Sequence, residues 1–208
     1  MKNIFDFSPS PITLKRLAEY LCHLIQLPAD KFSQISSAQL SEMMATKPSQ
    51  LRQDFHHFGG FGQPGHPYDL QYLIDELKKI FGVDNQVNLL LFGATCMSTV
   101  LLEYPTLKEL NFNVSGVADS DKSKIGTEFC NHTVMSQDEL PDFLKKNRID
   151  IGAICTADPE PALNRLVENG IKTIWNLSPK YITVPTDVKI FHANIAAGLL
   201  TLAYNTKQ

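Results

Sequence analysis

The segment best suited to bind a nucleotide begins at one glycine. Gly93 follows the apolar run Val87–Phe92 and precedes a helical pattern, so free N–H groups at a helix N-terminus could face a phosphate. Asp119 closes the next apolar run, a position that suits an acidic residue accepting hydrogen bonds from an adenosine ribose. The dinucleotide fingerprint needs three glycines, whereas Thr95 and Ser98 follow here. Two interpretations stay open, a dinucleotide site or a parallel sheet with an altered pocket.

A second group of polar residues could read DNA. The pattern after Pro48 predicts a helix over 49–58, with Leu51, Phe55 and Phe58 facing inward. Arginine can pair with guanine and glutamine with adenine through two hydrogen bonds each. The candidate DNA-binding residues are Lys47, Ser49, Gln50, Arg52, Gln53, His57 and Gln63. The other interpretation is a solvated helix face of the kind any short amphipathic helix has.

The elements around this helix form a helix-turn-helix pattern. Apolar spacing predicts a helix over 12–27 and a short second helix that starts at a serine cap before Leu40. The glycines and prolines of 59–67 predict a tight hairpin, the wing of a winged helix. A fourth helix ends at Gly82. The chain is therefore expected to divide near residue 83.

Beyond Gly82, strands alternate with helices, which predicts a parallel sheet with right-handed crossovers. The expected strands are 87–92, 112–118, 149–155 and 172–176, and the expected helices are 96–110, 138–146, 159–169 and an apolar tail over 193–204. The expected domains are a winged helix over 1–83, a Rossmann-like domain over 84–190 and a C-terminal dimerisation helix within 191–208. The fold class is α/β.

Composition excludes several classes of protein. The 208 residues are 43% hydrophobic and 20% charged, which excludes intrinsic disorder, and no apolar run approaches the roughly 20 residues of a membrane span. No apolar stretch follows the first residues, so we expect a soluble, cytoplasmic protein without a signal peptide. The cysteines, Cys22, Cys96, Cys130 and Cys155, form no CxxC pair, so neither a zinc site nor a disulfide framework is expected. No catalytic motif of the GxSxG or HExxH kind occurs, so we expect no enzyme and no metal.

The whole pattern resembles the Rex family of bacterial redox-sensing repressors. The matching pieces are Ile35–Leu40, Gln50–Gly59, Tyr104–Pro105, Asp119–Asp121 with Lys124–Gly126, Asn176–Pro179 and Ala197–Leu199. The resemblance implies a homodimer that binds a palindromic operator and releases it when NADH rises relative to NAD. It also implies that each C-terminal helix inserts between the domains of the partner. The cofactor-binding positions it implies are Gly93, Ala94, Thr95, Asp119 and Thr156.

Departures from the family pattern fall on functional positions. An Arg–Tyr–Asp set couples ligand state to domain rotation in the family, and those positions are Cys22, Tyr104 and Asn194 here. Where the family has a basic residue that reads bases, this chain has Gln53, and where the family has an arginine in the wing, this chain has Pro64. After the third Rossmann strand the family has Thr-Val-Pro, whereas this chain has Thr156-Ala157-Asp158. These changes predict weak NADH binding and DNA affinity that is lower and less salt-sensitive than is usual for the family.

The sequence therefore predicts a DNA-binding transcriptional repressor of the Rex type with altered NAD(H)-binding and switch residues. Two alternatives stay open. One is a dimerisation partner that does not bind DNA and forms inactive heterodimers with a Rex protein. The other is a regulator that responds to another nucleotide, to coenzyme A or to thiol oxidation, the last through Cys96 in the first turn after Gly93 or through Cys22.

Overall fold

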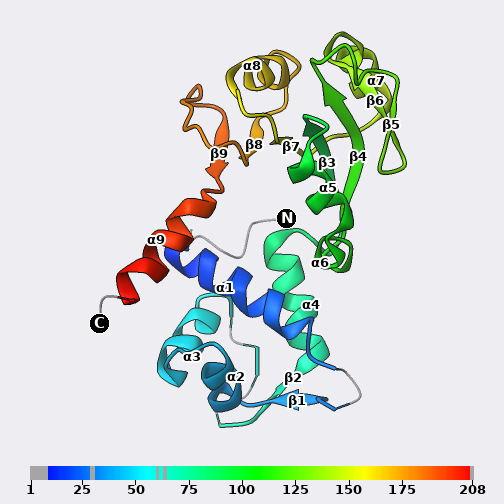
Figure 1. Ribbon diagram of the computed structural model, residues 1–208. Coiled ribbons are helices and arrows are strands. Elements are labelled where there is room, and N and C mark those ends of the chain that lie inside the picture. The colour runs from blue at the N-terminus through cyan, green and yellow to red at the C-terminus, as the bar shows by residue number, and fades with distance from the viewer. Residues whose placement is uncertain (1–8, 29–30, 60, 63–64, 207–208) are drawn as a thin grey trace. The chain divides into compact units, whose positions relative to one another are not determined.

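A computed structural model describes residues 9–28, 31–59, 61–62 and 65–206 of the chain (Figure 1). The chain divides into two compact units after Asn85. The first is mainly helical and the second is built on a parallel sheet. Each unit is described separately below.

The described part of the first unit contains four helices whose ends follow from local sequence. They are α1 (Pro11–Leu24), α2 (Ser37–Met43), α3 (Pro48–His56) and α4 (Leu70–Phe81). The predicted serine cap of α2 is confirmed, because the Ser36 hydroxyl accepts the Gln39 N–H and the Gln39 side chain accepts the Ser36 N–H. Gly82 ends α4 in the left-handed conformation, at φ 67°. The predicted helices therefore exist, although α1 ends at Leu24 and not at Leu27.

The expected hairpin over 59–67 is wrong for the residues that the structure describes there. None of them lies in a strand. Instead β2 (Tyr68–Asp69) pairs antiparallel with β1 (Gln34–Ile35), which precedes α2. The described residues of 59–67 thus belong to the connection between α3 and β2.

The second unit is a seven-stranded sheet in the order β5-β6-β4-β3-β7-β8-β9. The strands are β3 (Val87–Phe92), β4 (Phe112–Asp119), β5 (Glu128–Phe129), β6 (His132–Ser136), β7 (Ile151–Ile154), β8 (Thr173–Asn176) and β9 (Lys189–His192). Every neighbouring pair is parallel except β5 with β6. The six parallel strands are β3, β4, β6, β7, β8 and β9. If they are numbered 1 to 6 in chain order, their order across the sheet is 3-2-1-4-5-6, which is the Rossmann order. The order reverses between β3 and β7, so a crevice for ligands is expected beyond the carboxyl ends of these two strands.

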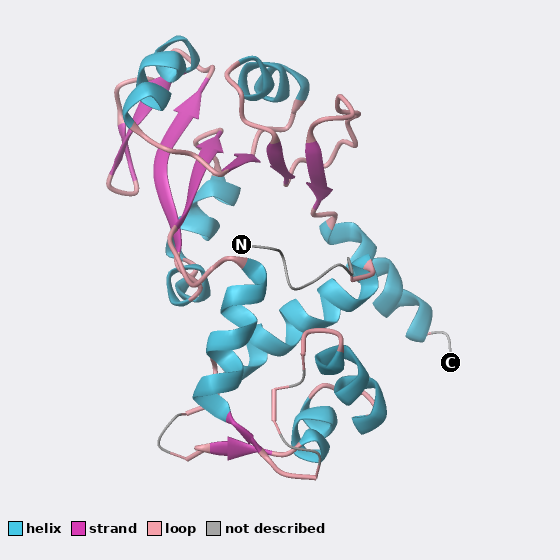
Figure 2. Ribbon diagram, turned by 180° about the vertical axis from the view of Figure 1, so that it is seen from behind, coloured by secondary structure: helices cyan, strands magenta, loops and turns pink. Residues whose placement is uncertain are grey.

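Both faces of this sheet are covered by helices (Figure 2). The helices are α5 (Cys96–Glu103), α6 (Pro105–Glu109), α7 (Leu140–Lys146), which follows a 3₁₀ turn over Gln137–Glu139, and α8 (Glu160–Glu168). Along β3, Leu90 and Phe92 join the core that contains residues of α7 and α8, whereas Leu91 joins the core that contains Leu101 of α5. This alternation explains the continuous apolar run of β3.

Several sequence predictions need correction in this unit. The helix expected over 96–110 is two helices, because Pro105 lacks an N–H and Tyr104 before it adopts an extended conformation. The strands β5, β6 and β9 were not predicted. Phe191, expected on the C-terminal helix, lies in β9 instead.

The last helix, α9 (Ile195–Asn205), buries none of its residues within the chain. Its large apolar side chains are exposed by about two thirds, including Leu199 at 63% and Leu202 at 63%. Among the described residues, no helix combines the length and the apolar character needed to cross a membrane.

Candidate DNA interface and nucleotide site

Helix α3 has one buried side and one exposed polar side. Leu51 and Phe55 are fully buried in the first unit. The exposed side carries Ser49, Arg52, Gln53 and His56, which lie three or four residues apart and so share one face. His56 was not among the sequence candidates, although its spacing from Gln53 and Arg52 could have identified it. This face is the part of α3 that is available to a DNA groove.

Gln50 does not belong to that face. Its side-chain amide donates to Asp54 Oδ1 at 3.0 Å, so the amide is directed along the helix toward a buried carboxylate. The sequence prediction that Gln50 reads bases is therefore not supported by this geometry. Helical spacing alone did not show this because Gln50 lies on the border between the two sides.

Asp54 is the centre of a buried polar network between α1 and α3. Its carboxylate accepts two hydrogen bonds from Arg16 and one from the Tyr20 hydroxyl at 3.0 Å. Burial would raise the pKa of Asp54, but the hydrogen bonds from Arg16, Gln50 and Tyr20 outweigh burial and hold it below its usual value. Burial, reinforced by the neighbouring Asp54, raises the pKa of Tyr20 to about 12. The network fixes α3 on α1, and no local pattern in the sequence connects Arg16 and Tyr20 with Asp54.

The remaining candidates in the first unit lie around α3. Lys47 is the N-cap residue of α3 and is exposed. Arg52 donates from Nη1 to the Ser37 hydroxyl of α2 at 3.2 Å. His57 follows the end of α3 and is exposed. Gln63 and Pro64 lie outside the described residues.

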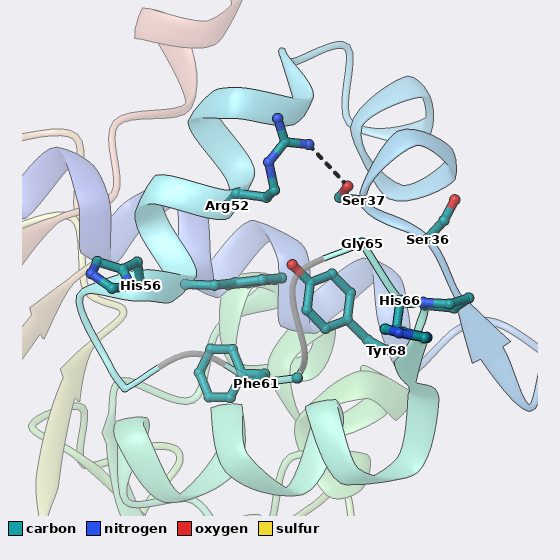
Figure 3. A pocket seen from close by; sticks show the side chains of 11 residues that line it. Ser36, Ser37, Arg52, His56, Phe61, Gly65, His66 and Tyr68 are labelled. Atoms are coloured by element: carbon teal, nitrogen blue, oxygen red, sulfur yellow. Dashed lines mark hydrogen bonds between the residues drawn. The ribbon is translucent and has the colours of Figure 1, made fainter.

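A hollow of about 470 Å³ lies beside this face, between the start of α2, the second half of α3 and the described residues of 61–68 (Figure 3). Its floor is aromatic, since Phe55 contacts Phe61 and Tyr68 edge to face at centroid distances of 5.0 and 5.4 Å. Ser37, Arg52, His56 and His66 are among the polar residues that line it. The floor thus packs as part of the core, while the rim is polar.

In the second unit, the loop after β3 is held by its own chain. Gly93 has φ 112°, and a Cβ there would lie 2.8 Å from the Thr156 Cγ2, so the position requires glycine. The Gly93 N–H donates to the Ala118 carbonyl and the Cys155 N–H to the Phe92 carbonyl. The loop therefore lies at the point where the strand order reverses between β3 and β7.

Asp119 binds this loop directly. Its Oδ2 accepts the Ala94 N–H at 2.8 Å and the Lys124 ammonium at 3.1 Å, and its Oδ1 accepts the Asp121 N–H at 2.9 Å. Burial would raise the pKa of Asp119, but these backbone hydrogen bonds and Lys124 hold it below its usual value. Lys124 also donates to the Ala94 carbonyl at 3.0 Å. The role of Lys124 was missed because only the fold brings it to the loop.

The two side chains that replace family glycines are both tied to the loop. The Thr95 hydroxyl donates to the Cys155 carbonyl at 3.0 Å. Ser98 is fully buried and its hydroxyl donates to the Gly93 carbonyl. Thr95 is the N-cap residue of α5, and no side chain caps this helix. The first N–H groups of α5 are thus not capped by a side chain, while the Thr95 hydroxyl is bonded to the Cys155 carbonyl.

The three switch positions are distributed over both units. Cys22 lies on α1, half-buried, and burial raises the pKa of its thiol. Tyr104 lies between α5 and α6 and is half-exposed. Asn194 caps α9 by accepting the Ala197 N–H, and its amide donates to the Tyr181 hydroxyl at 3.2 Å. Asn194 thus holds the start of α9.

These features define a class of protein: a helix-turn-helix unit with an exposed polar α3 face, followed by a Rossmann-type sheet with a nucleotide-type loop. Comparisons with known proteins agree with this class. A family model described as "Putative DNA-binding protein N-terminus" matches residues 10–56, and a model described as "CoA binding domain" matches residues 84–180.

Similar proteins identify the family. A redox-sensing transcriptional repressor Rex from Caldicellulosiruptor saccharolyticus is 36% identical over 197 residues, covering 94% of this chain and 90% of that protein. The Rex repressor of Clostridioides difficile is 34% identical over 201 residues, covering 96% of each chain. The chain belongs to the Rex family of redox-sensing transcriptional repressors, as its sequence predicted. These relatives are named as regulators and not as enzymes, in agreement with the prediction that this chain is no enzyme.

Solved structures support the same family. The crystal structure of RSP in complex with β-NAD⁺ and operator DNA has a TM-score of 0.85 at 33% identity and covers 97% of this chain and 94% of that chain. The complex of RSP with β-NADH has a TM-score of 0.83 at 32% identity and covers 97% and 95%. RSP is described as a Rex-family repressor. The predicted fold class is thus confirmed.

Proposed function

We propose that this protein is a homodimeric repressor that binds operator DNA through α3 and responds weakly to NADH. The observation that carries the DNA-binding part is the exposed polar face of α3 in a Rex-family chain. Ser49 and Gln53 lie on that face without side-chain partners from α1 or α2 that would turn them away, and they would meet base edges in the major groove. Lys47 and His57 at the two ends of α3 would contact phosphates.

Dimerisation is supported by α9. A helix on the surface of a monomer needs only one apolar side. In α9, exposed Ile195, Leu199 and Leu202 form one apolar stripe, and exposed Leu200 and Tyr204 lie on another side of the helix. A patch of this kind favours association with a second copy of the chain. The swapped arrangement that the resemblance implies would cover it. Operator binding also places the protein with DNA, in the cytoplasm.

The residues of the second unit fit part of NAD(H). Backbone N–H groups at Thr95 and the first turn of α5 would hold the pyrophosphate, and Asp119 keeps one accepting position on Oδ1 for a ribose hydroxyl. Gly93 and Ala94 form the turn, and Thr156 closes against Gly93. The Thr95 side chain would take up space in which a glycine of the family pattern leaves room for the pyrophosphate. We therefore propose that NADH binds more weakly to this protein than is usual for the family. NAD(H), when bound, supplies the redox signal.

Coenzyme A is the second candidate ligand, supported by the match of residues 84–180 to a CoA binding domain model. Both ligands share an adenosine diphosphate portion, which the same loop would hold. Mass spectrometry of the protein purified under native conditions would separate them, because each ligand has its own mass.

Gel-shift assays with fragments of the source genome test the repressor function. We expect retention of a few fragments in the absence of NADH, and release of them only at high NADH concentration. If no fragment is retained and the protein instead forms mixed dimers with a second Rex protein, the alternative role as an inactive dimerisation partner is supported.

A further inference from the structure

The hollow beside α3 has the chemistry of an anion site. Arg52 lies on its upper rim and bonds to Ser37, while His56 and His66 lie on opposite sides of it (Figure 3). Arg52 is exposed, and the single hydrogen bond described for it leaves most of its five N–H donors for a ligand. None of the described residues that line the hollow is an aspartate or a glutamate.

The charged groups nearest the hollow do not cancel this positive character. Asp54, next to Phe55 on α3, is buried and paired with Arg16. Asp69, next to Tyr68, accepts the Tyr72 N–H as the N-cap of α4. Burial raises the pKa of Tyr68 although nearby Arg52 opposes it, so the Tyr68 hydroxyl keeps its proton and remains a donor. Among the described residues of the rim, the remaining titratable groups are therefore two histidines and one arginine.

We propose that this hollow binds a phosphodiester group of the DNA backbone, with Arg52 as the fixed cation and His56 and His66 as cations when they are protonated. The inference rests on the proposed DNA binding by α3. Arg52 and His56 belong to both the exposed face of α3 and the lining of the hollow, whereas Ser49 and Gln53 belong to the face alone. A duplex whose groove receives Ser49 and Gln53 thus brings its backbone to the neighbouring hollow.

This arrangement makes DNA affinity depend on pH. An ordinary histidine titrates near pH 6.5, and an adjacent phosphate favours the protonated form. Residues 1–80 contain eight Lys/Arg and eight Asp/Glu, so protonated histidines would be a substantial part of the excess positive charge there. DNA binding is therefore expected to strengthen as pH falls from 8 to 6. The hydrogen bond from Arg52 to Ser37 keeps the guanidinium at the rim of the hollow. We therefore assign Arg52 to the DNA backbone, whereas its position in the sequence predicted that it reads bases.

The first test measures the binding of a 24-base-pair duplex of random sequence by fluorescence anisotropy, because phosphate contacts do not depend on sequence. For the full chain we expect at least about a tenfold loss of affinity between pH 6 and pH 8. The double variant His56→Gln/His66→Gln should lose most of this dependence, and its salt slope at pH 6 should be smaller by about 1 to 2. The matched control His23→Gln, an exposed histidine in the last turn of α1 outside the hollow, should behave as the unmodified chain.

The outcomes separate the inference from the proposed function. If the chain binds the duplex and the double variant retains the same pH profile and salt slope, the phosphate assignment is wrong while DNA binding stands. If the chain binds no duplex at any pH, both are wrong. A folded double variant is verified by its unchanged urea midpoint.

A second measurement identifies the source of the phosphate. In NMR spectra recorded at pH 6, the His66 ring signals should change their chemical shifts when duplex is added, while those of His23 stay unchanged. His66 ring signals that saturating duplex leaves unchanged would overturn the proposal. An equal shift with inorganic phosphate at the same phosphate concentration would assign the hollow to free phosphate instead and would also overturn it.

Discussion

Arg16 of α1 and Asp54 of α3 form a two-point ion pair, with Nε to Oδ2 at 2.7 Å and Nη2 to Oδ1 at 2.5 Å. The aspartate side chain is 1% exposed and the arginine 27% exposed. Paired hydrogen bonds of this kind define both the distance and the orientation between the two groups. The pair therefore fixes the angle at which α3 presents its exposed face.

Replacing Asp54 should destabilise the first unit. Asp54→Asn removes the charge that Arg16 pairs with, and we expect the free energy of unfolding to fall by about 3 kcal/mol. This value is at the lower end for a buried pair because Arg16 retains access to water. Urea unfolding would measure it. Asp75→Asn, an exposed residue of α4 bonded to Gln71, is the control and should change stability by less than about 0.5 kcal/mol.

The same pair predicts the response to acid. The pKa of Asp54 is lower in the folded chain than in the unfolded chain, so its contribution is complete above the ordinary pKa of about 3.9 and is lost as pH falls through the folded value. Asp54→Asn should therefore lose less stability than the unmodified chain between pH 5 and pH 3. Equal losses in both proteins would contradict this account of the pair.

Gln53 and Gln50 should differ in what their removal changes. Gln53→Ala should relax the base preference at one position, where a paired contact is worth about 1–3 kcal/mol of discrimination. Gln50→Ala removes a hydrogen bond to Asp54 and should lower stability by about 1–2 kcal/mol while the preferred sequence stays the same. Selection from a random duplex pool, followed by sequencing, would check both. A changed preference in Gln50→Ala would mean that its amide turns outward on DNA.

Thr95→Gly should raise NADH affinity. Removal of the side chain clears the space beside the first N–H groups of α5, and we expect about a fivefold to tenfold gain, or roughly 1 kcal/mol, by calorimetric titration. Ser98→Gly is the comparison, since its hydroxyl is buried against Gly93 and its removal should not open the seat. Submicromolar NADH affinity in the unmodified chain would refute the role given to Thr95.

The exposed stripe of α9 should hold the dimer together. Leu199→Glu places a charge in the middle of that stripe and should convert the protein to a monomer at micromolar concentration, as measured by light scattering. Thr201→Glu, on another side of the same helix, should leave the dimer intact. A mass near one chain for the unmodified protein would contradict the proposal.

The four thiols should react in a defined order. Cys96 is exposed in the first turn of α5, whereas Cys155 is buried and burial raises its pKa to about 11. Brief treatment with iodoacetamide at pH 7.5 should modify Cys96 first and leave Cys155 unmodified until the protein unfolds. Mass spectrometry of peptides would report the order, and early labelling of Cys155 would show that the loop after β7 opens readily.

The sequence predicted the elements whose signals are local. The serine cap at Ser36, Gly82 after α4, and the apolar run of β3 each depend on neighbouring residues only, and each was predicted correctly. The strands β6 and β9 have short, mixed sequences, and their pairing with β4 and β8 comes from other parts of the chain. Because these strands were not predicted, the sequence did not predict the complete Rossmann strand order.

The candidate sites show the same division. Gly93 and Asp119 were found because their spacing follows the strands. The direction of a side chain was not predictable, and so the inward turn of Gln50 and the bond of Arg52 to Ser37 were missed. Both depend on which polar atom lies nearest in the folded unit. That information is set by tertiary packing.

The hydrogen bonds that Asp119 and Lys124 make with the Ala94 backbone have a thermodynamic consequence. The loop after β3 has its shape before any nucleotide arrives, because both the N–H and the carbonyl of Ala94 already have partners within the chain. A ligand that binds there meets a preorganised seat, and little conformational entropy is lost in ordering it. The rise in melting temperature on adding a nucleotide then reports the strength of the new contacts themselves, so a series of adenine nucleotides can be ranked by that rise alone.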